Sequence, residues 1–140
     1  MAFQGNFTCN TFKTGLMNGS FDFTSGSFYL ALYTNSASLN EDTTAYTATG
    51  EASGGNYVAG GNLLTIAQVP TVGNGDTAFI SFDNTSWTGA ITARGALIYL
   101  SGGGNPAVCV LDFGADKTST ATFTVQFPAV TNTSAIIRIS

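Results

Sequence analysis

The amino-acid sequence predicts an all-β protein, an antiparallel β-sandwich or jelly-roll-like barrel with a short N-terminal helix and arm. From residue 27 onward, short apolar segments follow one another at close spacing, several with the alternation of a β-strand. Turns rich in Gly, Asn and Pro separate these segments, and helical spacing occurs only before residue 20. We expect one domain over residues 1–140, in which 1–20 form the arm and helix and 27–140 form the sandwich.

The N-terminal segment contains the predicted helix. Phe12 and Leu16 lie at helical spacing, so both fall on one face that can dock on a sheet. Thr8 or Asn10 is the expected N-cap, because short polar side chains accept hydrogen bonds from the first unpaired N–H groups of a helix. Gly19 is the expected end, since glycine readily adopts the left-handed conformation that closes helices.

The predicted strands account for most of the remaining chain. Asn74-Gly75 is a strong signal for a tight hairpin turn. The long polar stretch over 35–62 is expected to form an ordered or half-ordered loop with one short strand near Tyr46. The strands are expected at 27–34, 63–70, 77–82, 91–100, 107–113, 121–128 and 134–140.

Arg94 lies close to the middle of the apolar segment "ITARGALIYL" and is one of only four Lys and Arg residues. The glycine-rich "SGGGNP" joins this segment to "AVCVLDF" as a hairpin, so Leu100 should face Pro106. In that register Arg94 faces Asp112, and opposite charges across a ladder stabilise the pairing modestly. We therefore expect a structural ion pair between Arg94 and Asp112.

Both faces of this hairpin are apolar near its loop. The same register puts Ile98 beside Val108, and Ala96 beside Val110, on one face. A half-solvated sheet would instead alternate apolar and polar residues. One face must therefore line the core, and the other must be covered by the N-terminal arm or by another protein. The other face carries Leu97, Tyr99, Cys109 and Leu111.

The charge and the N-terminus exclude several classes of protein. The net charge of −4 provides no basic footprint for nucleic acid or anionic membranes, and no apolar run reaches the length of a membrane span. The N-terminus lacks the basic and apolar regions of a signal peptide, so we expect synthesis in a cytosol and free thiols at Cys9 and Cys109. Whether the two thiols are ever bridged stays open. A charged fraction of only 9% is common in permanent assemblies, but a soluble all-β domain also shows it.

The residue types do not predict an enzyme. With no His, the common Ser-His-Asp and Cys-His systems and histidine metal sites are absent, and we expect no cofactor and no metal. Glu51 could supply one carboxylate of a glycosidase pair, and Glu41 with Asp42 could contribute to a calcium loop, although their spacing matches no known loop. The single tryptophan, Trp87, either packs as a loop residue against the sandwich edge or stacks on a sugar.

Four segments together resemble a family of small virion proteins of tailed bacteriophages. They are "FKTGLMNGSFDFTSGSFYLALYT", "TTAYTATGEASGGNYVAGG", "ITARGALIYLSGGGNPAVCVLDFGADKTST" and "FTVQFPA", and the resemblance runs from Phe12 to Ile139. No catalytic residues are associated with the family, so none carry over. The resemblance implies a structural protein of the phage particle, most plausibly a capsid decoration (cement) protein on the outer head surface, assembled in the host cytoplasm.

Decoration proteins generally clamp neighbouring capsomers, often as trimers, through apolar arms and sheet edges. The implied partners are the major capsid protein and further copies of this chain, with a trimer favoured. Buried aromatics dominate interface energies, which makes the N-terminal phenylalanines candidate anchors; the alternative is that they close the domain's own core. The candidate interface residues are Phe3, Phe7, Phe12, Leu16, Ile98, Leu100, Val108 and Val110.

Two other functions stay open at this point. A tail or fibre component that binds a host receptor predicts an exposed Trp87 or Tyr57. A glycan-processing enzyme predicts two close carboxylates, one of them with a raised pKa. The sequence does not separate a head protein from a tail protein, because both are β-rich assembly proteins of low charge.

Overall fold

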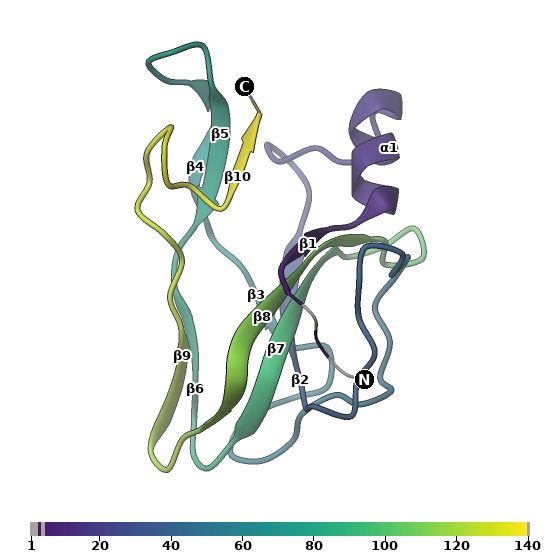
Figure 1. The fold of residues 1–140 in the computed structure, drawn as a ribbon, viewed down its shortest axis with the longest axis vertical. Helices are drawn as coiled ribbons and strands as arrows, with labels where there is room; N and C mark the ends of the chain where they lie inside the picture. The colour runs from purple at the N-terminus through teal and green to yellow at the C-terminus, as the bar shows by residue number, and fades with distance from the viewer. Residues whose placement is uncertain (1–2, 4, 140) are drawn as a thin grey trace.

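The computed structural model describes residues 3 and 5–139, and its strands form two packed layers (Figure 1). One layer is a five-stranded sheet in the order β1-β8-β7-β2-β3, and the other holds a three-stranded sheet, β10-β5-β4, and a two-stranded sheet, β6-β9. All pairings between these strands are antiparallel. The prediction of an all-β antiparallel sandwich is confirmed.

The strands of the five-stranded sheet are β1 (Phe7–Thr8), β2 (Phe28–Tyr33), β3 (Asn62–Leu63), β7 (Thr92–Leu100) and β8 (Ala107–Thr118). Those of the second layer are β4 (Ile66–Val72), β5 (Ala78–Phe82), β6 (Thr85–Thr88), β9 (Thr122–Val125) and β10 (Ile137–Ile139). In Figure 1 the two small sheets lie end to end on one side of the large sheet.

The N-terminal helix α1 (Asn10–Asn18) is present, and Gly19 ends it with a left-handed φ of 80°. Its N-cap is Cys9, whose side chain makes no cap hydrogen bond, so the prediction of Thr8 or Asn10 as N-cap is wrong. The reason is tertiary: β1 ends at Thr8, and the Asn10 N–H donates to the backbone oxygen of Glu41 at 2.8 Å. The Glu41 carbonyl thus satisfies one of the N–H groups at the start of the helix that a capping side chain could otherwise satisfy.

Two strand predictions need correction. The predicted strand 63–70 is divided into β3 and β4, because the chain crosses there from one layer to the other. The segment around Trp87 was predicted as a loop and forms β6, which pairs with β9. Trp87 is only 2% exposed, and its ring lies 5.5 Å from that of Tyr57. It therefore packs inside the sandwich and offers no surface for stacking on a sugar.

The core between the layers is built from aromatic and branched side chains of both. Phe28 of β2 stacks on Phe23 with ring centroids 4.4 Å apart, and Phe12 of α1 meets Phe21 edge-on at 5.0 Å. Such geometries are favourable for aromatic pairs beyond the burial of their area. The helix is therefore part of the core, docked on the sandwich through Phe12.

The outer face of the five-stranded sheet is also buried, as the sequence predicts, and the chain itself covers it. Leu97, Tyr99 and Val110 lie in a second apolar cluster with Phe3 of the N-terminal arm and Leu39 of the long loop. The short strand expected near Tyr46 is reduced to one isolated bridge between Ala45 and Pro106. The long loop is thus an ordered third layer over the sheet.

The predicted register of the hairpin between β7 and β8 holds only beside its loop. Tyr99 pairs with Ala107, as predicted, but a register shift follows, and Ile98 then pairs with Cys109. The bulge inserts one extra residue, Val108, into β8. The predicted facing pairs of Ile98 with Val108 and of Ala96 with Val110 are therefore wrong, and Gly95 rather than Arg94 faces Asp112.

Candidate assembly surface

Most of the interface residues predicted from the sequence do not lie at the surface. Five of the eight are buried in this chain's own two apolar clusters, so most of their surface is already covered in the folded chain. The physical reason is that α1, the arm and the long loop already cover the faces that these residues occupy. The buried residues are Phe3, Phe12, Ile98, Val108 and Val110, and the half-buried ones are Phe7, Leu16 and Leu100.

Arg94 and Asp112 form an ion pair although they do not face each other in the ladder. Arg94 Nε lies 3.1 Å from Asp112 Oδ1, and the side chains are 24% and 11% exposed. Burial raises the pKa of Asp112, but hydrogen bonds from the Gly114 N–H and from Arg94 outweigh it and hold the pKa below its usual value. The pair braces the middle of the hairpin, and neither residue lines any of the hollows described below.

A double-mutant cycle of Arg94→Ala and Asp112→Ala should show a coupling free energy of about 1 kcal/mol in urea unfolding at pH 7. Because the folded-state pKa of Asp112 is depressed, its contribution is present above the unfolded-state pKa of about 4 and disappears as the pH falls through the folded-state value. Additive effects of the two substitutions at pH 7 would show that the pair is a contact without energetic weight.

Glu51 anchors the long loop through three hydrogen bonds. Its Oε1 accepts from the Tyr46 hydroxyl at 2.7 Å, and its Oε2 accepts from the Tyr57 hydroxyl at 2.6 Å and from the Gly60 N–H at 2.7 Å. The Tyr57 oxygen in turn accepts the Leu32 N–H of β2 at 2.9 Å. Glu51 therefore ties the covering loop to the sheet, and none of these hydrogen bonds involves a second carboxylate of the kind that a glycosidase pair requires.

The two cysteines are free thiols in the structure. Cys9 lies in the outer apolar cluster and Cys109 in the inner one, so the sheet separates the two side chains. Burial raises the pKa of Cys9 to about 11 and that of Cys109 to about 12. Both thiols are therefore protonated at neutral pH and behave as small apolar groups.

The described residues contain no group of three or more His, Cys, Asp or Glu side chains that could hold a metal ion. In the loop that the sequence linked to calcium, Asp42 Oδ1 instead accepts a hydrogen bond from Asn10 Nδ2 at 3.0 Å. Over the same residues, the helix is too short and too polar to cross a membrane.

One side of the sandwich, between the edges of β1 and β8 in one layer and β9 and β10 in the other, is open. We call it the open side; it faces the reader in Figure 1. The residues that line it enclose three hollows, here named upper, middle and lower. The upper and middle hollows share Thr8, Cys109 and Ile136 as lining residues, so they form one continuous trench.

The upper hollow lies between α1 and the edge strand β10 and measures about 770 Å³. Phe12, Lys13 and Leu16 line it from the helix, and 137–139 line it from the strand. An apolar recess of about 410 Å³ adjoins it under β10 and shares Phe12 and Leu16 with it. At its mouth Ile139 is 55% exposed, which is unusual for a large apolar strand residue.

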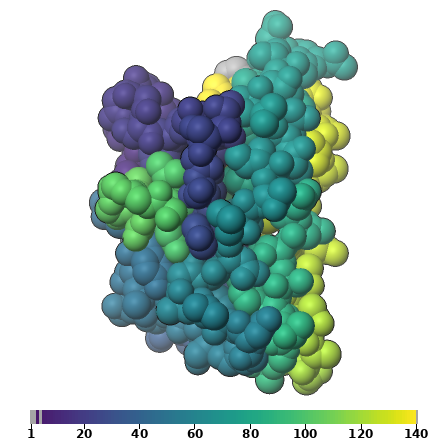
Figure 2. All heavy atoms as spheres, turned by 180° about the vertical axis from the view of Figure 1, so that it is seen from behind, coloured from purple at the N-terminus to yellow at the C-terminus, as the bar shows by residue number. Residues whose placement is uncertain are grey.

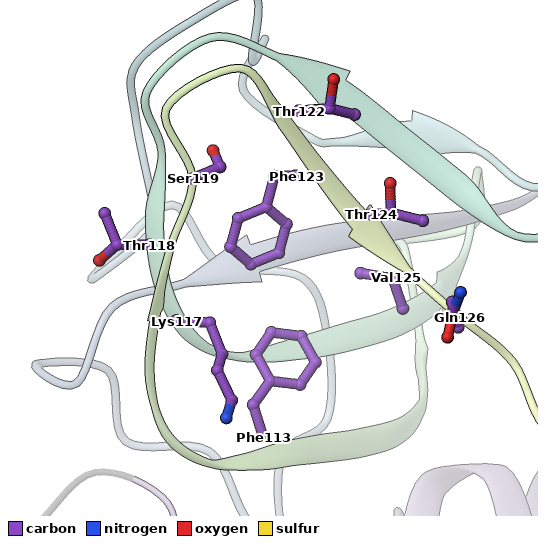
Figure 3. Close-up of a pocket in the computed structure, with 9 residues that line it drawn as sticks. All are labelled: Phe113, Lys117, Thr118, Ser119, Thr122, Phe123, Thr124, Val125 and Gln126. Carbon is purple, nitrogen blue, oxygen red and sulfur yellow. The ribbon is translucent and has the colours of Figure 1, made fainter.

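The lower hollow lies between β8 and β9 and measures about 410 Å³ (Figure 3). Phe113 and Phe123 form its apolar wall, with ring centroids 6.1 Å apart, and Lys117 extends beside Phe113. The middle hollow, about 190 Å³, lies beside β1. The open side therefore offers hollows of mixed polar and apolar lining, with an apolar recess beside the upper one, that the chain leaves uncovered.

The opposite side is closed by contacts between the layers. Asn62 Nδ2 donates to Thr85 Oγ1 at 2.9 Å and to the Ser86 backbone oxygen at 3.0 Å. Figure 2 shows the segments around these residues side by side on that surface. The contrast singles out the open side as the candidate assembly surface.

Comparison of the chain with protein-family profiles, curated proteins and solved structures found no match. Of the residues predicted from the sequence, Phe7, Phe12, Leu16 and Val110 line the open side. The predicted strand 134–140 contains β10, but reasoning from sequence missed that β10, Phe113 and Phe123 line an open side, because this follows from the order of the strands in two sheets. No local pattern shows that the outer edge of β10 stays unpaired.

Proposed function

We propose that this chain is a structural protein of a tailed bacteriophage particle, a capsid decoration protein that binds the outer head surface and stabilises capsomer contacts. The major capsid protein is the proposed partner, and the chain acts as a homo-oligomer, with a trimer favoured. The observation that carries the proposal is the open side, where uncovered hollows and an apolar recess lie beside unpaired strand edges.

Two further observations support an assembly role. Ile139, which lines the upper hollow, is 55% exposed, and the chain by itself gains no stability from exposing a large apolar residue. The sparse charge, 9% of residues, keeps the cost of removing charged groups from water low in any interface that forms. The burial of Trp87 removes one of the two aromatic side chains that were expected to be exposed in a tail protein, and the other, Tyr57, is half-buried and donates its hydroxyl to Glu51.

The test is saturable binding of the purified chain to expanded phage heads that lack it. Ile139→Asp should weaken binding about tenfold or more, because it places a carboxylate on the apolar open side. The matched control is Val58→Asp, which introduces the same charge at a residue that is 71% exposed and lines none of the open-side hollows. Absence of saturable binding, or equal binding of both variants and the parent, contradicts the proposal.

Immunogold labelling of purified particles tests the location independently. Gold spread over the whole head is the expected result. Gold at the tail or at one vertex would replace the decoration role with a tail role.

A further inference from the structure

The open side exposes strand edges whose backbone groups have no partner. β10 lies at the edge of its sheet, and β9 pairs only with β6. Among the backbone hydrogen bonds that the described residues form outside their own helices and strands, none involves residues 136–139 or 122–125. An unpaired edge of this kind is a template for one more strand.

The other edge of the same sheet is protected in ways that β10 is not. β4 carries Pro70, which has no N–H to donate, and two register shifts interrupt its pairing with β5. Natural proteins use such prolines and irregularities to prevent pairing with other chains. β10 has neither proline nor bulge and lies directly beside the upper hollow. The difference between the edges favours β10 as the place where a strand is added.

The charges along the open side identify the chemistry of that strand. Three of the four cations of the chain line its hollows: Lys13 and Arg138 the upper one, and Lys117 the lower one. None of the residues that line the upper, middle and lower hollows is Asp or Glu, although the chain has eight. The fourth cation, Arg94, is paired with Asp112. Asp22 lines the recess that adjoins the upper hollow. A protein of net charge −4 therefore concentrates three of its four cations on this side, here named the positive strip.

We infer that the upper hollow binds an extended acidic segment of another polypeptide, which adds a strand to the outer edge of β10. This inference deepens the proposed function and rests on it for the identity of the partner as a capsid component. Alternate side chains of such a strand point to opposite faces. Apolar residues on one face would enter the hollow beside Phe12, Leu16 and Ile137, and carboxylates on the other would meet Lys13 and Arg138.

The helix makes this site selective for one strand. α1 forms the far wall of the upper hollow, so an added strand is held between a helix and a sheet edge and no second strand can follow it. Backbone hydrogen bonds to β10 supply affinity, while the hollow and the cations select the side chains.

The experiment selects short random peptides from a displayed library against the immobilised full-length chain. Sequences that alternate apolar residues with Asp or Glu should be enriched, and binding of the selected peptides should slow amide exchange in β10. The double variant Lys13→Glu with Arg138→Glu should bind those peptides about tenfold more weakly or worse and should enrich peptides rich in Lys instead. Lys117→Glu is the matched control, with the same charge reversal in the lower hollow and an unchanged selection.

Three outcomes overturn the inference: no enrichment, enriched peptides whose binding ignores the charge reversal, or protection of amides elsewhere than in β10. If the chain binds phage heads but binds no acidic peptide, the decoration role stands and the inference about strand addition to β10 is wrong. If the chain binds acidic peptides but not phage heads, the inference about β10 stands and the decoration role is wrong.

Discussion

Replacement of Glu51 by alanine should lower the free energy of unfolding by about 3 kcal/mol, and with it the melting temperature by about 10 °C. The carboxylate accepts three hydrogen bonds, and its removal leaves the hydroxyl groups of Tyr46 and Tyr57 and the N–H of Gly60 without their acceptor. Unsatisfied donors in a partly buried site lose more than the hydrogen bonds themselves are worth.

The tyrosines around Glu51 show how far this site is removed from water. Burial, followed by the hydrogen bond to Glu51, raises the pKa of Tyr46 to about 12, and the same two causes raise the pKa of Tyr57 further. The hydroxyl groups are thus fixed as donors at every ordinary pH.

Thermal and urea unfolding of Glu51→Ala checks this expectation. Glu41→Ala is the control: it removes an exposed carboxylate from the same loop and should change stability by less than about 0.5 kcal/mol. Equal stability of the two variants would mean that apolar contacts alone hold the loop on the sheet.

Phe3→Ala should destabilise the fold by about 3–4 kcal/mol, comparable to the loss of a core phenylalanine elsewhere. Phe3 is only 4% exposed, and it packs on the backbone of β7 at Gly95. A Cβ at residue 95 would lie 2.5 Å from the Phe3 ring and 2.5 Å from the backbone oxygen of Leu111, so glycine makes room for the ring. The N-terminal arm is therefore part of the fold.

Urea unfolding of the Phe3→Ala variant measures this cost, with Met17→Ala, at an 83% exposed position, as a control that should be nearly neutral. The hypothesis drawn from the sequence, in which Phe3 anchors the chain to a partner, makes the opposite prediction. In that case the Phe3→Ala variant would be as stable as the parent but would not bind particles. Such a result would show that the N-terminal arm contacts a partner.

The sequence predicted the fold class because alternation and turn residues act locally. The strands around Leu30, Ile80 and Ile98 and the helix end at Gly19 depend on neighbours in the chain, and the structure has them where expected. The bulge at Val108 was not predictable, since both registers keep the hairpin apolar on both faces. Only the packing of Tyr99 and Cys109 against different layers separates them.

The candidate surface was less predictable than the fold. Apolar composition identified Phe12 and Leu16 as candidate interface residues. It did not show how much of each side chain is covered by the rest of the chain. The open side results from the order of strands in separate sheets, which places β1 and β8 opposite β9 and β10. Its positive strip gathers Lys13, Lys117 and Arg138 from positions far apart in the sequence, so no local motif marks it.

The covering of the large sheet by an irregular loop has a consequence for the order of folding. The β7–β8 hairpin closes over a short turn, whereas the cover depends on contacts between distant segments such as Phe3 and Gly95. Loop closure over long separations is slow, so the hairpin should form while Leu97 and Val110 still face water. A folding intermediate with a bare apolar sheet is prone to aggregate. The yield of refolding should therefore fall steeply with protein concentration. Chaperones that bind exposed apolar surfaces should act on this chain before the hydrogen bonds of Glu51 fix the loop on the sheet.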